Sequence, residues 1–307
     1  MIRSSKMNKE EQEYLANYDI AKYDRPSIAV DMAIFTISDS HLDNADYRKL
    51  PDKRLKLLMI KRGQPPYKDM WALPGGFCKK GETVYEAALR ELKEETATDK
   101  AYLEMCNVFS ESGRDPRGWI ISQAFMALIN SKTVNVKAGG DAWEARWFDV
   151  ELKRISKEQY VIDQSGNNTI ESDSVFELKM YHNDIIIGAK IKEKRLYRDY
   201  HESVEYDVVE SDGIGFDHGK IIIYILNKLR NKVETDGKIV FDLMPEYFTL
   251  TDLQKAFEII LDRKLLTANF RRKISEYVTE TDRIITGGGH RPAKMFIRNI
   301  DAFYKND

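Results

Sequence analysis

Three glutamates, Glu91, Glu94 and Glu95, stand close together near the end of the segment Gly75–Ala97. A helix over about 83–96 would place them within about 100° of one another, since each helical residue adds about 100°. Like charges at this spacing destabilise a helix by about 0.2–0.5 kcal/mol per pair, a cost that a divalent cation removes. Mg²⁺ prefers carboxylate oxygens and waters, neutralises phosphate oxygens and can activate a water for attack at phosphorus. The alternative is a solvated acidic face without function.

The loop before these glutamates favours a site over a solvated face. Gly75 and Gly76 stand together there, and two glycines permit both close backbone approach and positive φ, as a phosphate-facing turn requires. The wider pattern is Gly76-x5-Glu82-x7-Arg90-Glu91-Leu92-x-Glu94-Glu95, preceded by WALPGGF. This pattern resembles the Nudix box of the Nudix hydrolase superfamily, and its many fixed positions make a chance match improbable.

The resemblance implies a fold, a metal and a set of roles. The fold would be an α/β (α+β) Nudix α/β/α sandwich, with the box helix packed against a mixed sheet. Glu91, Glu94 and Glu95 would hold Mg²⁺, or Mn²⁺ in its place, and the Gly76 region would offer a backbone carbonyl. Arg90 would orient a box carboxylate, with Glu82 as its partner, so that the implied catalytic residues are Glu94, Glu95 and Arg90.

One position departs from the family pattern. The box ends in Gly elsewhere, whereas this chain has Ala97, followed by Thr98 in place of a larger apolar residue. A glycine there would suit a helix end in the left-handed region, where alanine costs about 1 kcal/mol. The change concerns the end of the helix and leaves the metal ligands intact.

A second segment, SGRDPRGWIIS, suggests the substrate. It brings Arg114 and Arg117 beside a Pro-Gly turn, and arginine forks suit bidentate contacts with phosphate. An exposed surface turn is the alternative. The RDPRGW stretch is similar to that of ADP-ribose pyrophosphatase-like Nudix proteins and their regulator relatives, which implies ADP-ribose or a related dinucleotide bound by Arg114, Arg117, Gly75 and Gly76. Trp71 or Trp119 could stack on an adenine, although packing is the commoner role of tryptophan.

The C-terminal part has the outline of a winged helix-turn-helix, with two short helices, a turn and a Gly-rich basic hairpin. Seven Lys or Arg residues face three acids between Thr267 and Arg298, in a chain with a net charge of −2. Thr267 is expected to cap the second helix. The first turns of a recognition helix reach base edges, and a wing meets phosphates. The expected DNA-binding residues are Asn269, Arg271, Arg272, Lys273, His290, Arg291 and Lys294.

The alternative is a helical domain that serves dimerisation only. Against it, FDHGKIIIYILNKLR, NFRRKI and GGGHRPAKMF are similar to the C-terminal half of the Nudix-related transcriptional regulators, the NrtR group. That resemblance covers about 30–150 and 214–298. It implies a Nudix domain that senses ADP-ribose or another ligand, and a winged helix that holds double-stranded DNA as a homodimer.

Several elements must position these residues, and they divide the chain into four parts. The parts are an N-terminal arm (1–24), a Nudix domain (25–155), a β-rich insertion or linker (156–213) and the winged helix-turn-helix domain (214–307). In the insertion, VFELKMYH alternates apolar and polar residues, which predicts a small β-meander. A helix is expected over Phe216–Lys232, followed by a strand-like VFDL.

Whole-chain composition limits the classes of protein. The 307 residues are 42% hydrophobic and 32% charged, as in a globular protein with a charge-rich surface. No run of about 18 apolar residues is present, so a membrane span is not expected. The N-terminus lacks the pattern of a signal peptide, and Cys78 and Cys106 are too few for a disulfide framework. These features favour the cytoplasm.

Two functions therefore remain open. The first is a ligand-responsive transcription factor whose Nudix domain binds, and also hydrolyses, an ADP-ribose-like metabolite. The second is an ADP-ribose pyrophosphatase whose C-terminal domain serves only dimerisation. A third, lesser possibility is that a sugar has replaced the nucleotide as the sensed ligand.

Overall fold

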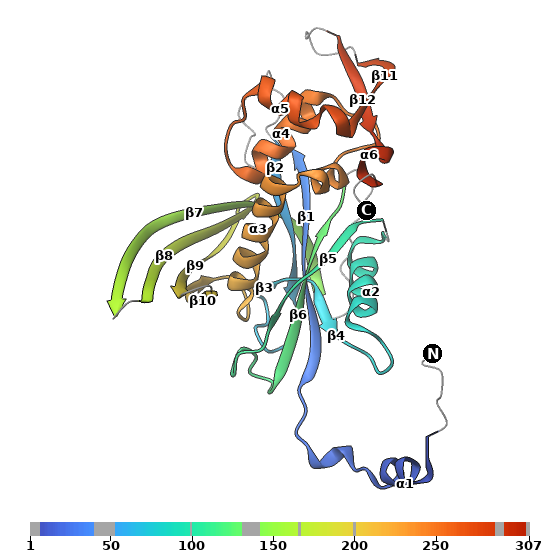
Figure 1. The fold of residues 1–307 in the computed structure, drawn as a ribbon, viewed down its shortest axis with the longest axis vertical. Coiled ribbons are helices and arrows are strands. Elements are labelled where there is room, and N and C mark those ends of the chain that lie inside the picture. Colours follow the sequence, from blue (N-terminus) through green and yellow to red (C-terminus); the bar gives the residue numbers. More distant parts are fainter. Residues whose placement is uncertain are drawn as a thin grey trace.

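The computed structural model describes residues 7–39, 53–98, 100–130, 142–164, 167–198, 201–285 and 292–304. A ten-stranded sheet forms its centre, with strand order β10-β9-β8-β7-β2-β1-β6-β5; β3 pairs with β2, and β4 with β1 (Figure 1). β1 and β6 run parallel, whereas the other neighbours in this order are antiparallel. The sheet is therefore mixed, as expected for the predicted fold class.

The first six strands belong to the half of the chain that carries the glutamate helix. They are β1 (Ser27–Asp39), β2 (Lys53–Arg62), β3 (Trp71–Ala72), β4 (Gly75–Phe77), β5 (Tyr102–Phe109) and β6 (Ile120–Leu128). Alternation along β1 sends Val30 and Met32 to one face and Ala33 and Phe35 to the other, and all four are buried. Helix α2 (Val84–Thr96) covers the first face and helix α3 (His218–Thr235) the second, which completes the α/β/α sandwich.

The predicted β-meander is present, and it extends the central sheet. Its strands are β7 (Ala142–Gln164), β8 (Asn167–His182), β9 (Ile185–Arg198) and β10 (His201–Asp212). Leu178 and Met180 of β8 are buried beneath α3, as their alternation predicted. We placed a boundary near residue 155, but β7 runs through that position without a break, pairing first with β2 and then with β8. The meander therefore shares the hydrogen-bonded ladder of the sheet.

The C-terminal elements gather at one end of the sheet (Figure 1). After α3 come the 3₁₀ helix η3 (Lys238–Leu243), α4 (Leu250–Leu261), α5 (Thr267–Ile274), the 3₁₀ helix η4 (Ser275–Tyr277), a two-stranded hairpin of β11 (Val278–Ile285) and β12 (Ala293–Arg298), and α6 (Ile300–Tyr304). This order is that of a winged helix-turn-helix. The strand-like VFDL lies instead in η3, where Val240, Phe241 and Leu243 all turn into the core.

The N-terminal segment forms the expected short helix. Helix α1 (Lys9–Asn17) and the 3₁₀ helix η1 (Ile20–Lys22) lie away from the rest of the chain in Figure 1, and neither has a buried residue. Within the described ranges, no helix is long and apolar enough to cross a membrane.

Candidate functional site

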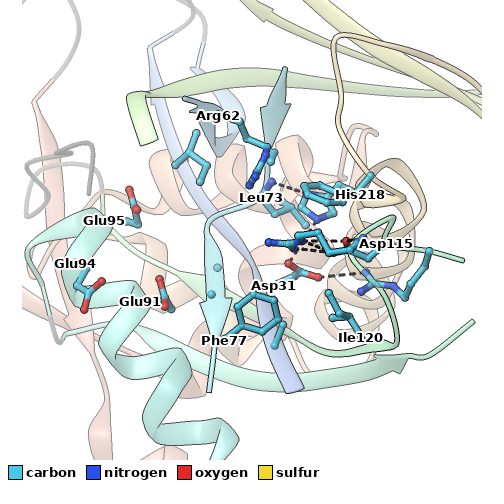
Figure 2. A pocket seen from close by; sticks show the side chains of 18 residues that line it. Asp31, Arg62, Leu73, Phe77, Glu91, Glu94, Glu95, Asp115, Ile120 and His218 are labelled. Carbon is cyan, nitrogen blue, oxygen red and sulfur yellow. Dashed lines mark hydrogen bonds and ion pairs between the residues drawn. The ribbon is translucent and has the colours of Figure 1, made fainter. Parts of the chain in front are cut away.

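A cavity of about 340 Å³ lies between α2, β4, the loop before β6 and the start of α3. This volume falls in the range of small-molecule sites. Figure 2 shows the three box glutamates on one side of the cavity and Asp31, Asp115 and His218 gathered on the other. The arginines at positions 62, 114 and 117 also line it. The cavity thus joins a wall of carboxylates to a wall that contains guanidinium groups.

Helix α2 presents the glutamates because its two ends and its apolar face are fixed. Thr83 caps its N-terminus, and Thr83 and Glu86 exchange the two hydrogen bonds of a capping box. On the inner face, the helix buries Ala87, Ala88 and Leu92 against the sheet. The cavity then receives Glu91 and Glu95, which are buried, and Glu94, which is 46% exposed.

Arg90 ties the box carboxylates together. Its Nε donates to Glu82 Oε1 at 2.8 Å, its Nη1 lies 2.5 Å from Glu91 Oε1, and its Nη2 donates to the carbonyl oxygen of Phe77. The bond with Arg90 lowers the pKa of Glu82 to about 2, whereas burial raises the pKa of Glu91. Arg90 therefore contacts both carboxylates that the resemblance named as its partners.

The two glycines are required for close approach and not for positive φ. A Cβ at Gly76 would lie 2.2 Å from Glu91 Oε1, and a Cβ at Gly75 would lie 2.1 Å from the carbonyl oxygen of Val30. Neither glycine has a positive φ, which corrects the prediction of a left-handed turn. The reason is that both lie in β4 and pair with β1. A side chain at residue 76 would displace Glu91 from the cavity wall.

The carboxylates suit a divalent cation in chemistry, but their present arrangement does not enclose one. Among the residues that the structure describes, no group of three or more His, Cys, Asp or Glu side chains could hold a metal ion. Arg90 Nη1 lies 2.5 Å from Glu91 and 3.6 Å from Glu94 Oε1. The glycine backbone at 76 leaves room beside Glu91. Holding a cation therefore requires the side chains of α2 to draw together.

Arg114 lies inside the protein and is paired with two aspartates. Its side chain is 5% exposed; its Nη2 lies 2.7 Å from Asp217 Oδ1 and 3.4 Å from Asp31 Oδ2, and its Nε donates to Asp217 Oδ2 at 3.0 Å. These partners raise the pKa of Arg114 despite burial. The sequence suggested phosphate contacts for Arg114 but did not reveal these carboxylates.

Arg117 lies nearer the opening, with 40% of its side chain exposed. It forms a two-pronged ion pair with Asp115, at 2.7 Å for the shortest contact. Its guanidinium also lies 5.0 Å from the ring centre of Phe77 and 5.4 Å from that of Phe216. Arg62 lies over the same Phe216 ring at 4.9 Å, so this part of the cavity combines aromatic faces with cations.

His218 connects the cavity to the start of α3. Its Nδ1 accepts the backbone N–H of Leu73 at 2.8 Å, and its Nε2 lies 3.5 Å from Asp31 Oδ1. Burial lowers the pKa of His218, so the ring is neutral with its proton on Nε2. Sequence reasoning missed Asp31, Asp217 and His218, because none stands in a motif near the box.

The two tryptophans that could have stacked on an adenine do not line the cavity. Trp71 is 4% exposed and packs edge-on against Phe148, 4.8 Å between ring centres. Trp119 is 56% exposed. For Trp71 the packing role holds, and the aromatic rings that do border the cavity belong to Phe77 and Phe216.

Helix α5 carries the basic residues expected to reach DNA. Phe270 and Ile274 are buried, and Phe270 packs edge-on against Phe257 of α4. The opposite side exposes Asn269, Arg271, Arg272 and Lys273. The expected cap is wrong, because the residue at the cap is Leu266, without a side-chain bond, and Thr267 is the first helical residue. The tight link from α4 leaves no further residue to cap the helix.

The predicted wing is the hairpin of β11 and β12. Lys294 is exposed on β12 and pairs with Glu280 on β11. His290 and Arg291 lie outside the described residues. Arg283 of β11 stacks over the ring of Tyr247, 3.7 Å from its centre, so it also contributes a cation to this hairpin.

Comparison with known proteins accounts for both halves of the chain. Residues 49–163 match the NUDIX domain, and residues 240–297 match the NrtR DNA-binding winged helix domain. The chain thus joins a NUDIX domain to an NrtR winged helix domain. Neither match includes residues 214–218, which complete the cavity.

Relatives share these domains to different extents. The chain is 28% identical over 290 residues to the "ADPR responsive transcriptional repressor NtrR" of Acinetobacter baylyi, covering 93% of this chain and 87% of that protein. The NUDIX domain is 46% identical over 99 residues to an ADP-ribose pyrophosphatase of Methanocaldococcus jannaschii, covering 32% of this chain and 57% of that enzyme. The fold is similar to that of Shewanella oneidensis NrtR complexed with a 27mer DNA (TM-score 0.57, 21% identity, 90% of this chain and 94% of that one).

Proposed function

We propose that this chain is a DNA-binding transcriptional regulator that responds to ADP-ribose or a related nucleoside diphosphate derivative, as a homodimer in the cytoplasm. One observation carries the proposal: a cavity with carboxylates on one wall and arginines on the other occurs in the same chain as an exposed basic helix of a winged helix domain. The relative from A. baylyi is ADPR-responsive and aligns along both domains, which supports the assignment.

The cavity suits a diphosphate flanked by apolar or aromatic groups. Arg117 already forms a fork with a carboxylate, and the same fork can receive a phosphate. The ring of Phe77 is 42% exposed beside it, where a base or ribose can pack. The glutamates opposite would repel a diphosphate, so ligand binding requires positive charge between them.

A divalent cation would meet this requirement, and Nudix hydrolases generally use one. We propose Mg²⁺, with Mn²⁺ as a substitute, held by Glu91, Glu94 and Glu95. When bound, such a cation neutralises phosphate charge and makes a water more acidic. In the chain itself, Arg90 fixes the side chain of Glu91 and Gly76 leaves space beside it, while Glu94 and Glu95 would orient the attacking water.

Calorimetric titration of the full chain with ADP-ribose, with and without Mg²⁺, tests the ligand. We expect saturable binding that weakens when the cation is chelated. Binding of neither ADP-ribose nor AMP in the presence of Mg²⁺ or Mn²⁺ would refute a nucleotide ligand.

A second function, hydrolysis of ADP-ribose, is supported by the retained box glutamates and by the similarity to the pyrophosphatase of M. jannaschii. If the chain releases AMP, Glu94→Gln should slow the release by at least about 100-fold, the scale on which losing one charge-stabilising group acts. Glu86→Gln is the matched control, since it lies on the same helix, is exposed and keeps its capping ability. Equal turnover in the Glu94 variant and the control would refute this metal assignment.

For DNA, we propose that Asn269, Arg271, Arg272 and Lys273 enter the major groove and that His290, Arg291 and Lys294 meet the backbone. Arg271→Ala with Arg272→Ala should weaken DNA binding and reduce the slope of log affinity against log salt by about 2, since each phosphate contact adds about 0.9. Lys153→Ala with Lys157→Ala removes two exposed charges from β7 and should leave both quantities unchanged. DNA binding that neither pair alters would contradict the assignment.

A further inference from the structure

The segment that joins the two domains contributes to the cavity of the NUDIX domain. Phe216 and His218 line that cavity, although residues 214–218 lie outside both domain matches. Asp217, between them, holds Arg114 from 103 positions away. The ligand site is therefore completed by the first residues of α3, the helix that leads into the winged helix domain.

Arg114 has two possible anionic partners once a phosphate enters. In the structure its guanidinium makes two contacts with Asp217, at 2.7 and 3.0 Å, and both side chains are almost fully buried. A buried ion pair is costly to break unless another charge replaces the lost partner. A ligand phosphate in this cavity is such a replacement, because Arg114 lines it.

Asp217 also has an alternative partner. It occupies the N-cap of α3, and aspartate is among the residues that best cap a helix through the side chain. Here its side chain makes no capping hydrogen bond, since both oxygens contact Arg114. Release of Arg114 would allow Asp217 to accept from the exposed N–H groups at the start of α3. The start of α3 therefore has two alternative sets of hydrogen bonds.

The other end of α3 holds the elements that carry the DNA-binding residues. Arg230 Nε donates to the carbonyl oxygen of Ile260 in α4 at 3.0 Å. Lys273 Nζ of α5 donates to the carbonyl oxygen of Glu234 at 3.1 Å, and Arg263 pairs with the Glu234 side chain at 2.6 Å. The 18 residues of α3 span about 27 Å, so one rigid element connects the cavity to the recognition helix (Figure 1).

We infer that Asp217 is the residue through which ligand binding reaches the DNA-binding domain. The inference rests on the proposed function. A diphosphate takes Arg114 from Asp217, Asp217 turns to cap α3, and the resulting shift of α3 moves α4 and α5 together. Asp217 acts by positioning Arg114 and α3 and need not touch the ligand itself.

The test compares Asp217→Asn with Asp115→Asn in the full chain. Asparagine keeps the size and the capping ability of Asp217 and removes the charge that holds Arg114. The control removes the carboxylate that pairs with Arg117 in the same cavity, but Asp115 lies in the loop before β6 and has no link to α3. For each protein, affinity for a duplex selected from random sequence by the unaltered chain is measured without and with saturating ADP-ribose and Mg²⁺.

The ratio of these two DNA affinities measures the coupling, which in allosteric proteins is commonly about 5- to 150-fold. We expect Asp217→Asn to bring the ratio close to one and to tighten ADP-ribose binding by about fivefold or more. We expect Asp115→Asn to keep the ratio of the unaltered chain even if its ADP-ribose affinity changes. A full ratio in Asp217→Asn would overturn the inference and leave the proposed function standing, whereas an unaltered chain that fails to bind ADP-ribose would refute both.

Hydrogen exchange of the unaltered chain provides a measurement that does not depend on a folded variant. Amides of residues 218–221, at the start of α3, should exchange more slowly once ADP-ribose is bound, because Asp217 then caps them. Unchanged exchange at these amides in a chain saturated with ADP-ribose would also overturn the inference.

Discussion

Replacing Ala97 by glycine should stabilise the NUDIX domain. Ala97 ends α2 at φ 54° and ψ 19°, in the left-handed region, and its N–H donates to the carbonyl oxygen of Lys93 at 3.0 Å. The side chain is exposed, so its removal sacrifices no core packing. This is the position at which the sequence departs from the glycine of the box pattern.

The magnitude follows from two opposing effects. An L-residue in the left-handed region costs about 1–2 kcal/mol, which glycine avoids. Glycine also raises the conformational entropy of the unfolded chain, which returns about 0.4–1 kcal/mol. We therefore expect Ala97→Gly to raise the free energy of unfolding by about 0.5–1 kcal/mol.

Urea unfolding followed by circular dichroism measures this difference, with Lys93→Gly as the matched control. Lys93 is exposed on the same helix in ordinary helical conformation, so glycine there should lower the free energy of unfolding by about 1 kcal/mol. Equal destabilisation by the two substitutions would refute the argument that Ala97 is strained.

Two further predictions concern buried groups. Lys56 and Asp149, whose side chains are 2% and 4% exposed, pair at 3.4 Å, so Lys56→Met should lower the free energy of unfolding by about 3–5 kcal/mol and Lys56→Met with Asp149→Leu should recover much of it in urea unfolding; a double variant no better than the single one would contradict this. Burial raises the pKa of Cys106 to about 11, so its folded-state stabilisation is complete below about pH 9 and is lost as pH rises toward 11, and its labelling by a thiol reagent should stay slow at pH 8.5 until the chain unfolds. Fast labelling of Cys106 in the folded chain at pH 8.5, with Cys78→Ser to isolate it, would contradict the second prediction.

Local patterns were sufficient to predict the carboxylate wall of the site. The spacing of Glu91, Glu94 and Glu95 fixed their common face, because it depends only on helical geometry. The left-handed end at Ala97 was likewise expected, since the box normally ends in glycine. The burial of Phe270 and Ile274 in α5 also followed from helical periodicity.

The opposite wall depends on how distant segments meet. Asp217 lies 103 residues from Arg114, and no periodicity relates them, so their ion pair follows only from the path of α3 back across the sheet. The prediction of positive φ at Gly75 and Gly76 failed for the same reason. Their pairing with β1, far upstream in the sequence, sets an extended conformation that the local dipeptide does not reveal.

The boundary expected near residue 155 shows a further limit. Turn-forming and polar residues after ARWFDV suggested that the domain ended there, yet β7 continues to Gln164. Both of its partners, β2 and β8, offer unbroken edges, and a strand continues wherever its backbone groups find partners. Polar composition in this region reflects exposed faces of the sheet.

The central claim is that one chain couples a nucleotide to DNA, and one titration tests it most directly. The full chain is bound to its selected duplex, and ADP-ribose with Mg²⁺ is added while DNA binding is followed by fluorescence anisotropy. We predict a saturable change in DNA affinity of at least about fivefold, at ADP-ribose concentrations that match its calorimetric binding. DNA affinity that stays constant while the cavity is saturated with ADP-ribose would contradict the account.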